Sequence, residues 1–175
     1  MSNVSLNKND HSTTPRLGVI GGGQLAQMLG EAAIHRNIDL TIQTTSKSDP
    51  ATICAKKIIL ADQKDIKGTR EMSLNTSSIT FENEWIDLEV LQTLENEGVK
   101  FIPTLSSLTS LVDKSSQRIL LRELNIPGVE WIELSNIKIS DNKLPENWTF
   151  PLMAKASRGG YDGKGTRVIK DFKEL

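Results

Sequence analysis

The sequence predicts an α/β protein, a doubly wound parallel sheet followed by the start of a second domain. Short apolar strands alternate with helical segments as far as Ile102, which is the pattern of a parallel sheet. The first strand is joined to the first helix by three consecutive glycines, Gly21 to Gly23. A second glycine-rich stretch lies between Phe150 and Ile169 and is flanked by strands of its own. Ligands of doubly wound sheets bind beyond the carboxyl ends of the strands, so the residues there are the first candidates for a site.

Five strands and three helices are expected in the first domain. The first helix has one apolar face that is expected to point inward, formed by Leu25, Met28, Leu29, Ala32 and Ala33. The expected strands are Arg16–Ile20, Asp39–Gln43, Lys57–Leu60, Ser78–Phe81 and Lys100–Ile102. The later helices are expected near residues 64–74 and 86–98. Together they define a domain over residues 16–112, preceded by a polar tail, residues 1–15, which we expect to be disordered.

The first glycine turn has two interpretations. The first N–H groups of a helix are unpaired, so a glycine turn leading into a helix favours an anion. The run GGGQLA even matches the G-x-G-x-x-G/A dinucleotide fingerprint. That fingerprint also needs an acidic residue about 20 positions further, at the end of the next strand. Asp49 comes later, inside the turn sequence SKSDP. A structural tight turn, or a site for another phosphate-bearing ligand, is therefore preferred.

Two carboxylates follow the fourth strand, Glu82 and Glu84. If the chain stays extended there, the two side chains share a face at the ligand-binding edge of the sheet. Acidic residues also favour a helix N-terminus for purely structural reasons. Both interpretations stay open from the sequence.

A second domain is expected over residues 113–175. Asp113 is a good N-cap for a helix with Ile119, Leu120 and Leu124 inward. Lys114 lies in the first turn of that helix, where the helix dipole disfavours a cation. Such a conflict is typical of a binding site, although a solvated lysine explains it equally well. A strand is expected at residues 129–134.

The glycine-rich hairpin is the strongest functional signal. A strand, Pro151–Ala154, leads to Lys155, and a second strand, Thr166–Ile169, follows the loop. The loop contains four glycines, Gly159, Gly160, Gly163 and Gly165. From Lys155 to Arg167 the net charge is +3, in a chain whose total is −1. A basic, glycine-rich loop behind a strand-borne lysine predicts a cover for nucleotide phosphates. An ordinary hairpin with a solvated basic face is the alternative.

Composition excludes several classes of protein. The near-neutral charge argues against a nucleic-acid-binding protein, and no apolar run reaches the roughly 18–20 residues of a membrane span. The N-terminal residues lack the apolar core of a signal peptide. Cys54 is the single cysteine, which fits a reducing compartment, and we expect a cytoplasmic protein. The sequence offers no Cys/His cluster for zinc.

Four segments carry a resemblance to a known family: GGGQLAQML, ITFENE, DKSSQRILLRELNIP and PLMAKASRGGYDGKGT. Over residues 16–175 the chain resembles the ATP-dependent 5-(carboxyamino)imidazole ribonucleotide synthases of purine biosynthesis, members of the ATP-grasp superfamily. The resemblance implies a Rossmann-like pre-ATP-grasp domain over 16–112 and an incomplete ATP-grasp domain over 113–175. The family is longer, so the magnesium ligands are expected in the missing C-terminal part, and this chain alone is expected to be inactive. Ala26, Gln27, Lys114 and Arg118 depart from residues common in the family.

The resemblance also implies an activity and a set of site residues. ATP would phosphorylate bicarbonate, and the exocyclic amine of aminoimidazole ribonucleotide would then be carboxylated. Asp162 would be the catalytic residue. The ATP-binding residues would be Lys114, Lys155, Gly160, Tyr161, Asp162, Gly163, Lys164, Gly165 and Thr166. The ribonucleotide-binding residues would be Gln24, Glu84, Tyr161, Asp162 and Lys164. The cofactors would be ATP and Mg²⁺, and the full-length protein would be a homodimer.

Two alternative functions stay open. One is another ATP-grasp ligase, such as a formate-dependent ribonucleotide transformylase or a biotin carboxylase. The YDGKG motif argues against both of these enzymes. The other is a non-catalytic, NAD-type nucleotide-binding module built on Gly21–Ala26. The missing acidic residue after the second strand counts against that module.

Overall fold

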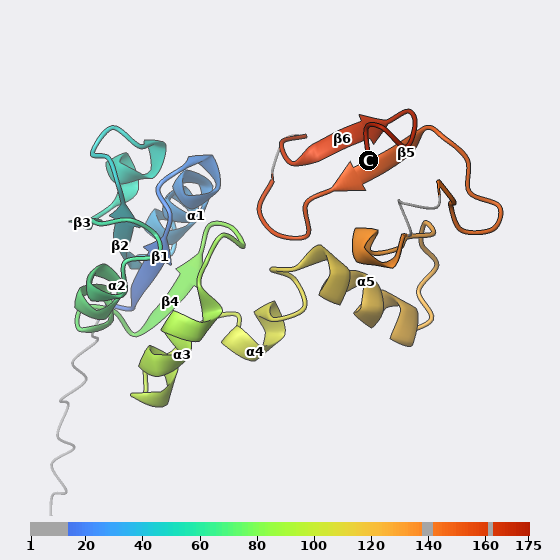
Figure 1. The fold of residues 1–175 in the computed structure, drawn as a ribbon. Coiled ribbons are helices and arrows are strands. Elements are labelled where there is room, and N and C mark those ends of the chain that lie inside the picture. The colour runs from blue at the N-terminus through green and yellow to red at the C-terminus, as the bar shows by residue number, and fades with distance from the viewer. Residues whose placement is uncertain (1–13, 138–141, 161–162) are drawn as a thin grey trace, which may run out of the picture. The chain divides into compact units, whose positions relative to one another are not determined.

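The computed structural model describes residues 14–137, 142–160 and 163–175 (Figure 1). The chain divides into two compact units. Unit 1 comprises the residues up to Asn83 together with Glu89–Ile102, and unit 2 comprises Glu84–Leu88 and Pro103–Leu175. The predicted domain bounds, 16–112 and 113–175, stay a prediction.

Unit 1 is built on a four-stranded parallel sheet. Its strands are β1 (Arg16–Ile20), β2 (Asp39–Thr44), β3 (Lys57–Leu60) and β4 (Ser78–Phe81), in the order β3-β2-β1-β4. β1 pairs with β2 on one side and with β4 on the other, all in parallel. The predicted α/β class with a parallel sheet is therefore confirmed.

Helices cover both faces of this sheet. Successive side chains of a strand point to opposite faces. On β1, Val19 packs in a core cluster with Ala26 and Ala33 of α1 (Gln24–Ile34), whereas its neighbour Gly18 faces Met72 of α2 (Ile66–Ser73). On β2, Leu40 and Ile42 belong to the cluster on the α1 side. The short helix η1 (Pro50–Cys54) contributes Ala51 to that cluster, and α3 (Leu88–Asn96) follows β4. The sheet is thus doubly wound, as the sequence predicts.

The buried face of α1 differs from the predicted one. Leu25 and Met28 are 57% and 59% exposed, whereas the buried residues are Ala26, Gly30 and Ala33. A Cβ atom at Gly30 would lie 2.5 Å from Cβ of Cys54. The helix therefore lies so close to η1 and β2 that only small residues fit beneath it, and the larger apolar residues occupy the other side. The predicted inward face, Leu25, Met28, Leu29, Ala32 and Ala33, is therefore confirmed for Ala33 and wrong for the three larger residues.

The predicted fifth strand, Lys100–Ile102, is reduced to a single parallel bridge between Ile79 and Phe101. The backbone N–H of Ile79 donates to Lys100 O at 2.8 Å, and Ile102 N–H donates to Ile79 O at 2.9 Å. The rings of Phe81 and Phe101 stack with their centroids 5.7 Å apart. Pro103 follows at once, and because it has no N–H group the ladder cannot continue.

Unit 2 contains little regular structure. Its helices are α4 (Leu105–Leu108), α5 (Lys114–Glu123) and η2 (Leu134–Asn136), and β5 (Leu152–Lys155) pairs in antiparallel fashion with β6 (Thr166–Ile169). Residues 129–133 form no strand, so that prediction is wrong. A strand needs a neighbour for its backbone hydrogen bonds, and β5 and β6 pair only with each other among the described residues.

The predicted inward face of α5 is also wrong. All ten residues of α5 are described and none is buried, and beyond it Leu124 is 59% exposed. An amphipathic helix buries its apolar stripe only where another surface covers it. Ile119, at 45% exposure, has no such cover within the described residues. Throughout the ranges that the structure describes, no helix has the length and apolar character needed to cross a bilayer.

Candidate functional site

The turn between β1 and α1 is filled by the side chain of Glu82, which follows β4. Its Oε2 accepts a hydrogen bond from Gly23 N–H at 2.9 Å, and its Oε1 accepts one from Ala26 N–H at 3.4 Å. The carboxylate therefore lies at the N-terminus of α1, where the unpaired N–H groups favour a negative charge. Of the two interpretations of Glu82, the structural one holds. Glu84, two residues on, has an exposed side chain and belongs to unit 2.

A second carboxylate borders the same turn. The hydroxyl of Thr44, at the end of β2, donates to Asp49 Oδ2, and a Cβ atom at Gly22 would lie 3.1 Å from Cβ of Asp49. The structure thus brings an acidic residue beside the glycine turn, which its place in the sequence did not indicate. Asp49 is bonded to Thr44, and Glu82 accepts from Gly23 N–H and Ala26 N–H, so two carboxylates border the turn and disfavour a further anion there. This arrangement argues against the dinucleotide alternative.

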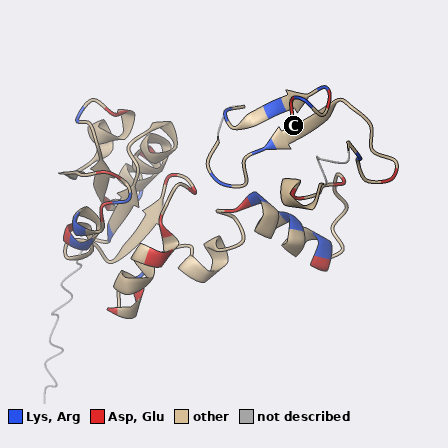
Figure 2. Cartoon of the chain, viewed as in Figure 1, with Lys and Arg blue, Asp and Glu red and all other residues tan. Residues whose placement is uncertain are grey.

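The two-stranded hairpin presents a mixed apolar and cationic face. Lys155 pairs with Thr166, and Met153 pairs with Val168, so these four side chains point to the same side. Met153 is 55% exposed and Val168 46% exposed. Figure 2 shows Lys and Arg residues on α5 and on both strands of the hairpin. One face therefore combines apolar surface suited to a base with a lysine suited to a phosphate.

The loop of the hairpin is closed by backbone contacts. Ala156 N–H donates to Gly165 O at 2.8 Å, and Thr166 N–H donates to Gly163 O at 3.2 Å. A Cβ atom at Gly160 would collide with the carbonyl oxygen of Lys164, so only glycine fits there. Gly163 differs, since a Cβ atom there would have no described atom within 4 Å. Tyr161 and Asp162 lie outside the described residues, and their predicted roles, including the catalytic role of Asp162, stay predictions.

The start of α5 is tied to the hairpin loop. Lys114 N–H donates to Ser157 O, and its ammonium Nζ donates to Gly159 O, each at 2.8 Å. The guanidinium Nε of Arg158 lies 3.3 Å from Oδ2 of Asp113. Lys114 thus finds a carbonyl partner that offsets its unfavourable place at a helix N-terminus. The structure brings Lys114 to the loop that contains Gly160, and the resemblance groups these two residues in one ATP site.

Asp113 anchors this arrangement. As predicted, it is the N-cap of α5, and its Oδ1 accepts a hydrogen bond from Ser116 N–H at 2.9 Å. That backbone N–H lowers the pKa of Asp113 below its usual value, with smaller contributions from Arg158, Ser157 and the Ser116 hydroxyl. The ion pair with Arg158 was missed from the sequence, because the two residues lie 45 positions apart.

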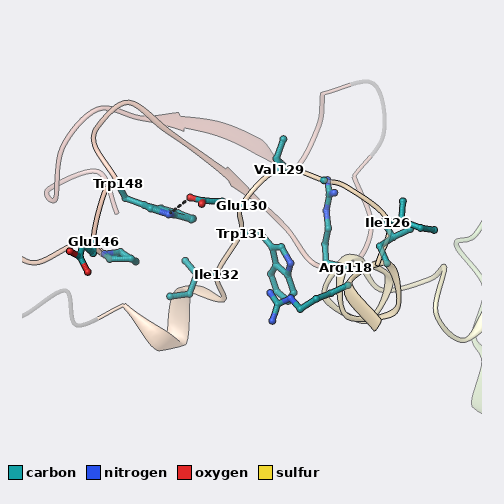
Figure 3. A pocket seen from close by; sticks show the side chains of 12 residues that line it. Arg118, Ile126, Val129, Glu130, Trp131, Ile132, Glu146 and Trp148 are labelled. Atoms are coloured by element: carbon teal, nitrogen blue, oxygen red, sulfur yellow. Dashed lines mark hydrogen bonds between the residues drawn. The ribbon is translucent and has the colours of Figure 1, made fainter. Parts of the chain in front are cut away.

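A separate pocket of about 440 Å³ lies in unit 2 (Figure 3). Trp148 Nε1 donates to Glu130 Oε2 at 3.0 Å, the contact drawn as a dashed line, and the guanidinium of Arg122 lies 5.1 Å from the ring centre of Trp131. Residues of α5 and of two irregular segments line it: Arg118, Leu121, Arg122, Ile126, Gly128, Val129, Glu130, Trp131, Ile132, Pro145, Glu146 and Trp148. None of the predicted site residues is among them. Across the described parts of the chain, no group of three His, Cys, Asp or Glu residues is arranged to hold a metal ion.

Comparison with known proteins identifies the family. The family model described as the ribonucleotide synthetase preATP-grasp domain matches residues 14–111. The chain belongs to this family. The pre-ATP-grasp domain therefore includes the Gly21–Gly23 turn and Glu82, while the hairpin lies beyond the matched range.

Relatives extend the likeness over most of the chain. The N5-carboxyaminoimidazole ribonucleotide synthase of Synechocystis is 41% identical over 159 residues, which are 91% of this chain and 39% of that protein. The crystal structure of N5-carboxyaminoimidazole synthetase from Staphylococcus aureus with ADP has a TM-score of 0.81 at 27% identity, over 91% of this chain and 42% of the other. The synthase from Aspergillus clavatus, in complex with ADP and 5-aminoimidazole ribonucleotide, has a TM-score of 0.78 at 26% identity. The match covers 92% of this chain and 42% of the other.

These likenesses confirm the resemblance drawn from the four sequence segments. The chain spans about two fifths of the length of the relatives it matches. Beyond the pre-ATP-grasp domain, the aligned part includes most of unit 2, because more than nine tenths of the chain is covered.

Proposed function

We propose that this chain is the N-terminal part of an ATP-dependent ligase that carboxylates aminoimidazole ribonucleotide with bicarbonate in purine biosynthesis. The observation that carries the proposal is the hairpin of unit 2, whose exposed face combines Lys155 with Met153 and Val168. The relatives named above are N5-carboxyaminoimidazole ribonucleotide synthases, and one was solved with ADP and the ribonucleotide. The length that this chain shares with them, about two fifths, makes the complete activity a proposal for the full-length protein.

The hairpin is proposed to bind ATP. The adenine would lie against the apolar side chains of the β5–β6 face, and Lys155 would pair with the α- and β-phosphates. Lys114, the first residue of α5, contacts the same loop through Gly159 O and would exchange that carbonyl for a phosphate oxygen. Backbone N–H groups of Gly160 and Gly163 to Gly165 would complete the phosphate contacts. Thr166 would contribute its hydroxyl, because its N–H donates to Gly163 O. Phosphoryl transfer depends on positioning and charge neutralisation, which lysines and backbone N–H groups supply.

The carboxylation step assigns roles to the remaining predicted residues. The γ-phosphoryl group would pass to a bicarbonate oxygen, giving carboxyphosphate and ADP. The exocyclic amine of the ribonucleotide would then attack the carboxyl carbon of carboxyphosphate and expel inorganic phosphate. Alternatively, carboxyphosphate would first break down to phosphate and carbon dioxide, which the amine would attack. The amine gives up one proton in either case. Asp162 would accept a hydrogen bond from that amine, and Lys164 would pair with the 5′-phosphate. As the resemblance implies, Tyr161, Gln24 and Glu84 would also contact the ribonucleotide; Gln24 and Glu84 are exposed residues.

Magnesium would neutralise phosphate charge when it is bound. The described residues contain no three-residue ligand group, so we propose that its ligands lie in the part of the relatives that this chain does not span. We also propose that the full-length protein is a cytoplasmic homodimer that binds neither nucleic acid nor membrane.

A chimera tests the proposed function directly. In it, this chain replaces the matched segment of the Synechocystis synthase, and ADP release is followed with bicarbonate, magnesium and aminoimidazole ribonucleotide. The chimera is expected to release ADP only when both bicarbonate and the ribonucleotide are present. Lys155→Ala should lower kcat/KM by roughly 100-fold, as loss of one charge-stabilising group does in other enzymes. Lys170→Ala, which removes the same charge just after β6, should leave the rate unchanged.

Two results would count against the proposal. One is a folded chimera that binds ATP but releases ADP at the same rate with and without the ribonucleotide. The other is equal loss of activity in the Lys155 and Lys170 variants. The 175-residue chain alone is expected to show no turnover above background under the same conditions.

A further inference from the structure

The N-terminus of α1 carries an anion that belongs to the protein itself. Glu82 lies 59 residues from Gly23 in the sequence, yet its two oxygens accept hydrogen bonds from Gly23 N–H and Ala26 N–H. Its own backbone is fixed as well, since Glu82 N–H donates to Ile20 O at 2.9 Å. A carboxylate bonded to backbone N–H groups at a helix N-terminus makes the contacts that a bound phosphate would make.

The glycines of the turn leave room for this carboxylate because they have no side chain. A Cβ atom at Gly21 or at Gly23 would lie less than 3.0 Å from side-chain atoms of Glu82. Gly21 also has a φ of +119°, which L-residues rarely adopt. A Cβ atom at Gly22 would collide in the same way with Thr44. The glycines therefore admit the protein's own side chains, whereas in a phosphate-binding loop the same absence of side chains admits the ligand.

We propose that Glu82 is a built-in anion that keeps phosphate groups out of the glycine turn of unit 1 and thereby determines its ligand specificity. A phosphate entering the turn would have to displace Glu82 from two charge-assisted hydrogen bonds. It would also be repelled by the carboxylate of Asp49, which accepts a hydrogen bond from the Thr44 hydroxyl beside the turn. The two donors, Gly23 and Ala26, lie on either side of Gln24 in the sequence. Glu82 therefore also fixes the backbone position of Gln24, the first residue of α1. This inference uses no step of the proposed ligase reaction.

Removing the carboxylate is expected to create a phosphate site. Glu82→Ala leaves Gly23 N–H and Ala26 N–H unpaired at the helix N-terminus. The matched control is Glu31→Ala, which removes one negative charge from an exposed position on the same helix, where Glu31 accepts a hydrogen bond from Gln27. Inorganic phosphate is the probe, with potassium chloride at equal ionic strength as the reference. Binding is read from the amide NMR signals of Gly23, Gln24 and Ala26 and from the thermal midpoint.

The expected result is a saturable phosphate-dependent shift of those amides in Glu82→Ala, with an affinity at least about tenfold above that of the wild-type chain and of Glu31→Ala. If Glu82→Ala is unfolded in phosphate-free buffer, phosphate should restore its circular dichroism, and chloride should not. The proposal is overturned if wild-type amides respond to phosphate as strongly as those of the variant. It is equally overturned if the variant neither binds nor is refolded by phosphate. Because no ATP or ribonucleotide is used, these results are independent of the ligase proposal.

Discussion

The chain contains two glycine-rich turns that look alike in sequence and differ in structure. In the turn at Gly21–Gly23, the space that a Cβ atom would fill is occupied by Glu82 and Thr44. In the hairpin loop, the Cβ positions of Gly159 and Gly163 have no described atom within 4 Å. The first turn is bordered by carboxylates, and the second by Lys114, Lys155 and Arg158. Glycine density alone therefore does not predict a phosphate site, because glycine also admits the protein's own side chains.

The difference extends to how each turn is held. Gly21 and Gly22 are buried at the carboxyl end of a parallel sheet, and Gly21 N–H donates to Gln43 O at 2.9 Å. Gln43 itself is fully buried, with its amide bonded to Asp62 O, Asp65 O and the Thr69 hydroxyl. The hairpin loop is exposed and is held by two backbone hydrogen bonds of its own and by the start of α5. Its groups can therefore exchange their protein contacts for those of a ligand at lower cost.

The largest expected effect is on stability. Gly21→Ala should destabilise the chain by about 3 kcal/mol or more, because a Cβ atom adds both positive-φ strain and a collision with Glu82. Gly163→Ala, at a φ of +80° in open space, should cost about 1–2 kcal/mol, since only the strain applies. Urea denaturation followed by circular dichroism measures both. Equal costs for the two substitutions would mean that packing does not distinguish the turns.

A smaller effect is expected on nucleotide affinity. Lys114→Met should weaken ADP binding about tenfold, because one charge-assisted contact with a phosphate is lost. Isothermal titration calorimetry with ADP and magnesium provides the measurement. Lys170→Met is the control for loss of one positive charge and should bind ADP like the wild type. A Lys114 variant with unchanged affinity would show that this lysine serves only to hold Gly159.

The smallest expected effect is a pH dependence of the hairpin anchor. The pKa of Asp113 is lowered in the folded chain, chiefly by Ser116 N–H. Its carboxylate therefore stabilises the fold above the unfolded-state pKa of about 3.9, and this stabilisation is lost as the pH falls through the lower native pKa. An NMR titration of the Asp113 carboxyl carbon should give a midpoint below that of a model peptide.

The matched variant for this titration is Asp113→Asn, which should remove the fall in the protection factor of Lys114 N–H, the donor to Ser157 O, below about pH 4. A midpoint for Asp113 at or above the usual value would show that the contacts to Ser116 and Arg158 do not hold in solution.

Local patterns were enough to predict several features. Alternating strands and helices predict the parallel sheet, and Asp113 is recognisable as an N-cap from its residue type and place. The hairpin strands and Lys155 at the end of β5 also follow from the local sequence. Each of these depends on residues close together in the chain.

Features that depend on distant contacts could not be predicted. The contact of Glu82 with Gly23 joins residues 59 apart, and nothing near either residue indicates it. Two neighbouring faces of α1 are apolar, one with larger residues such as Leu25 and Met28 and one with the small residues Ala26, Gly30 and Ala33. The small face is the buried one because Cys54 approaches Gly30 closely. Residues 129–134 have the composition of a strand but no described partner strand, and Trp131 lines a pocket instead.

One measurement tests most directly the claim that the hairpin, and not the first glycine turn, is the phosphate site. The ¹⁵N-labelled chain is titrated with ADP and magnesium while backbone amide shifts are followed in both turns. The amides of Lys155, Gly159, Gly160 and residues 163–166 should shift saturably, and those of Gly21 to Ala26 should stay within the shifts caused by salt alone. Saturable shifts at Gly23 and Ala26 with an unresponsive hairpin would contradict the claim.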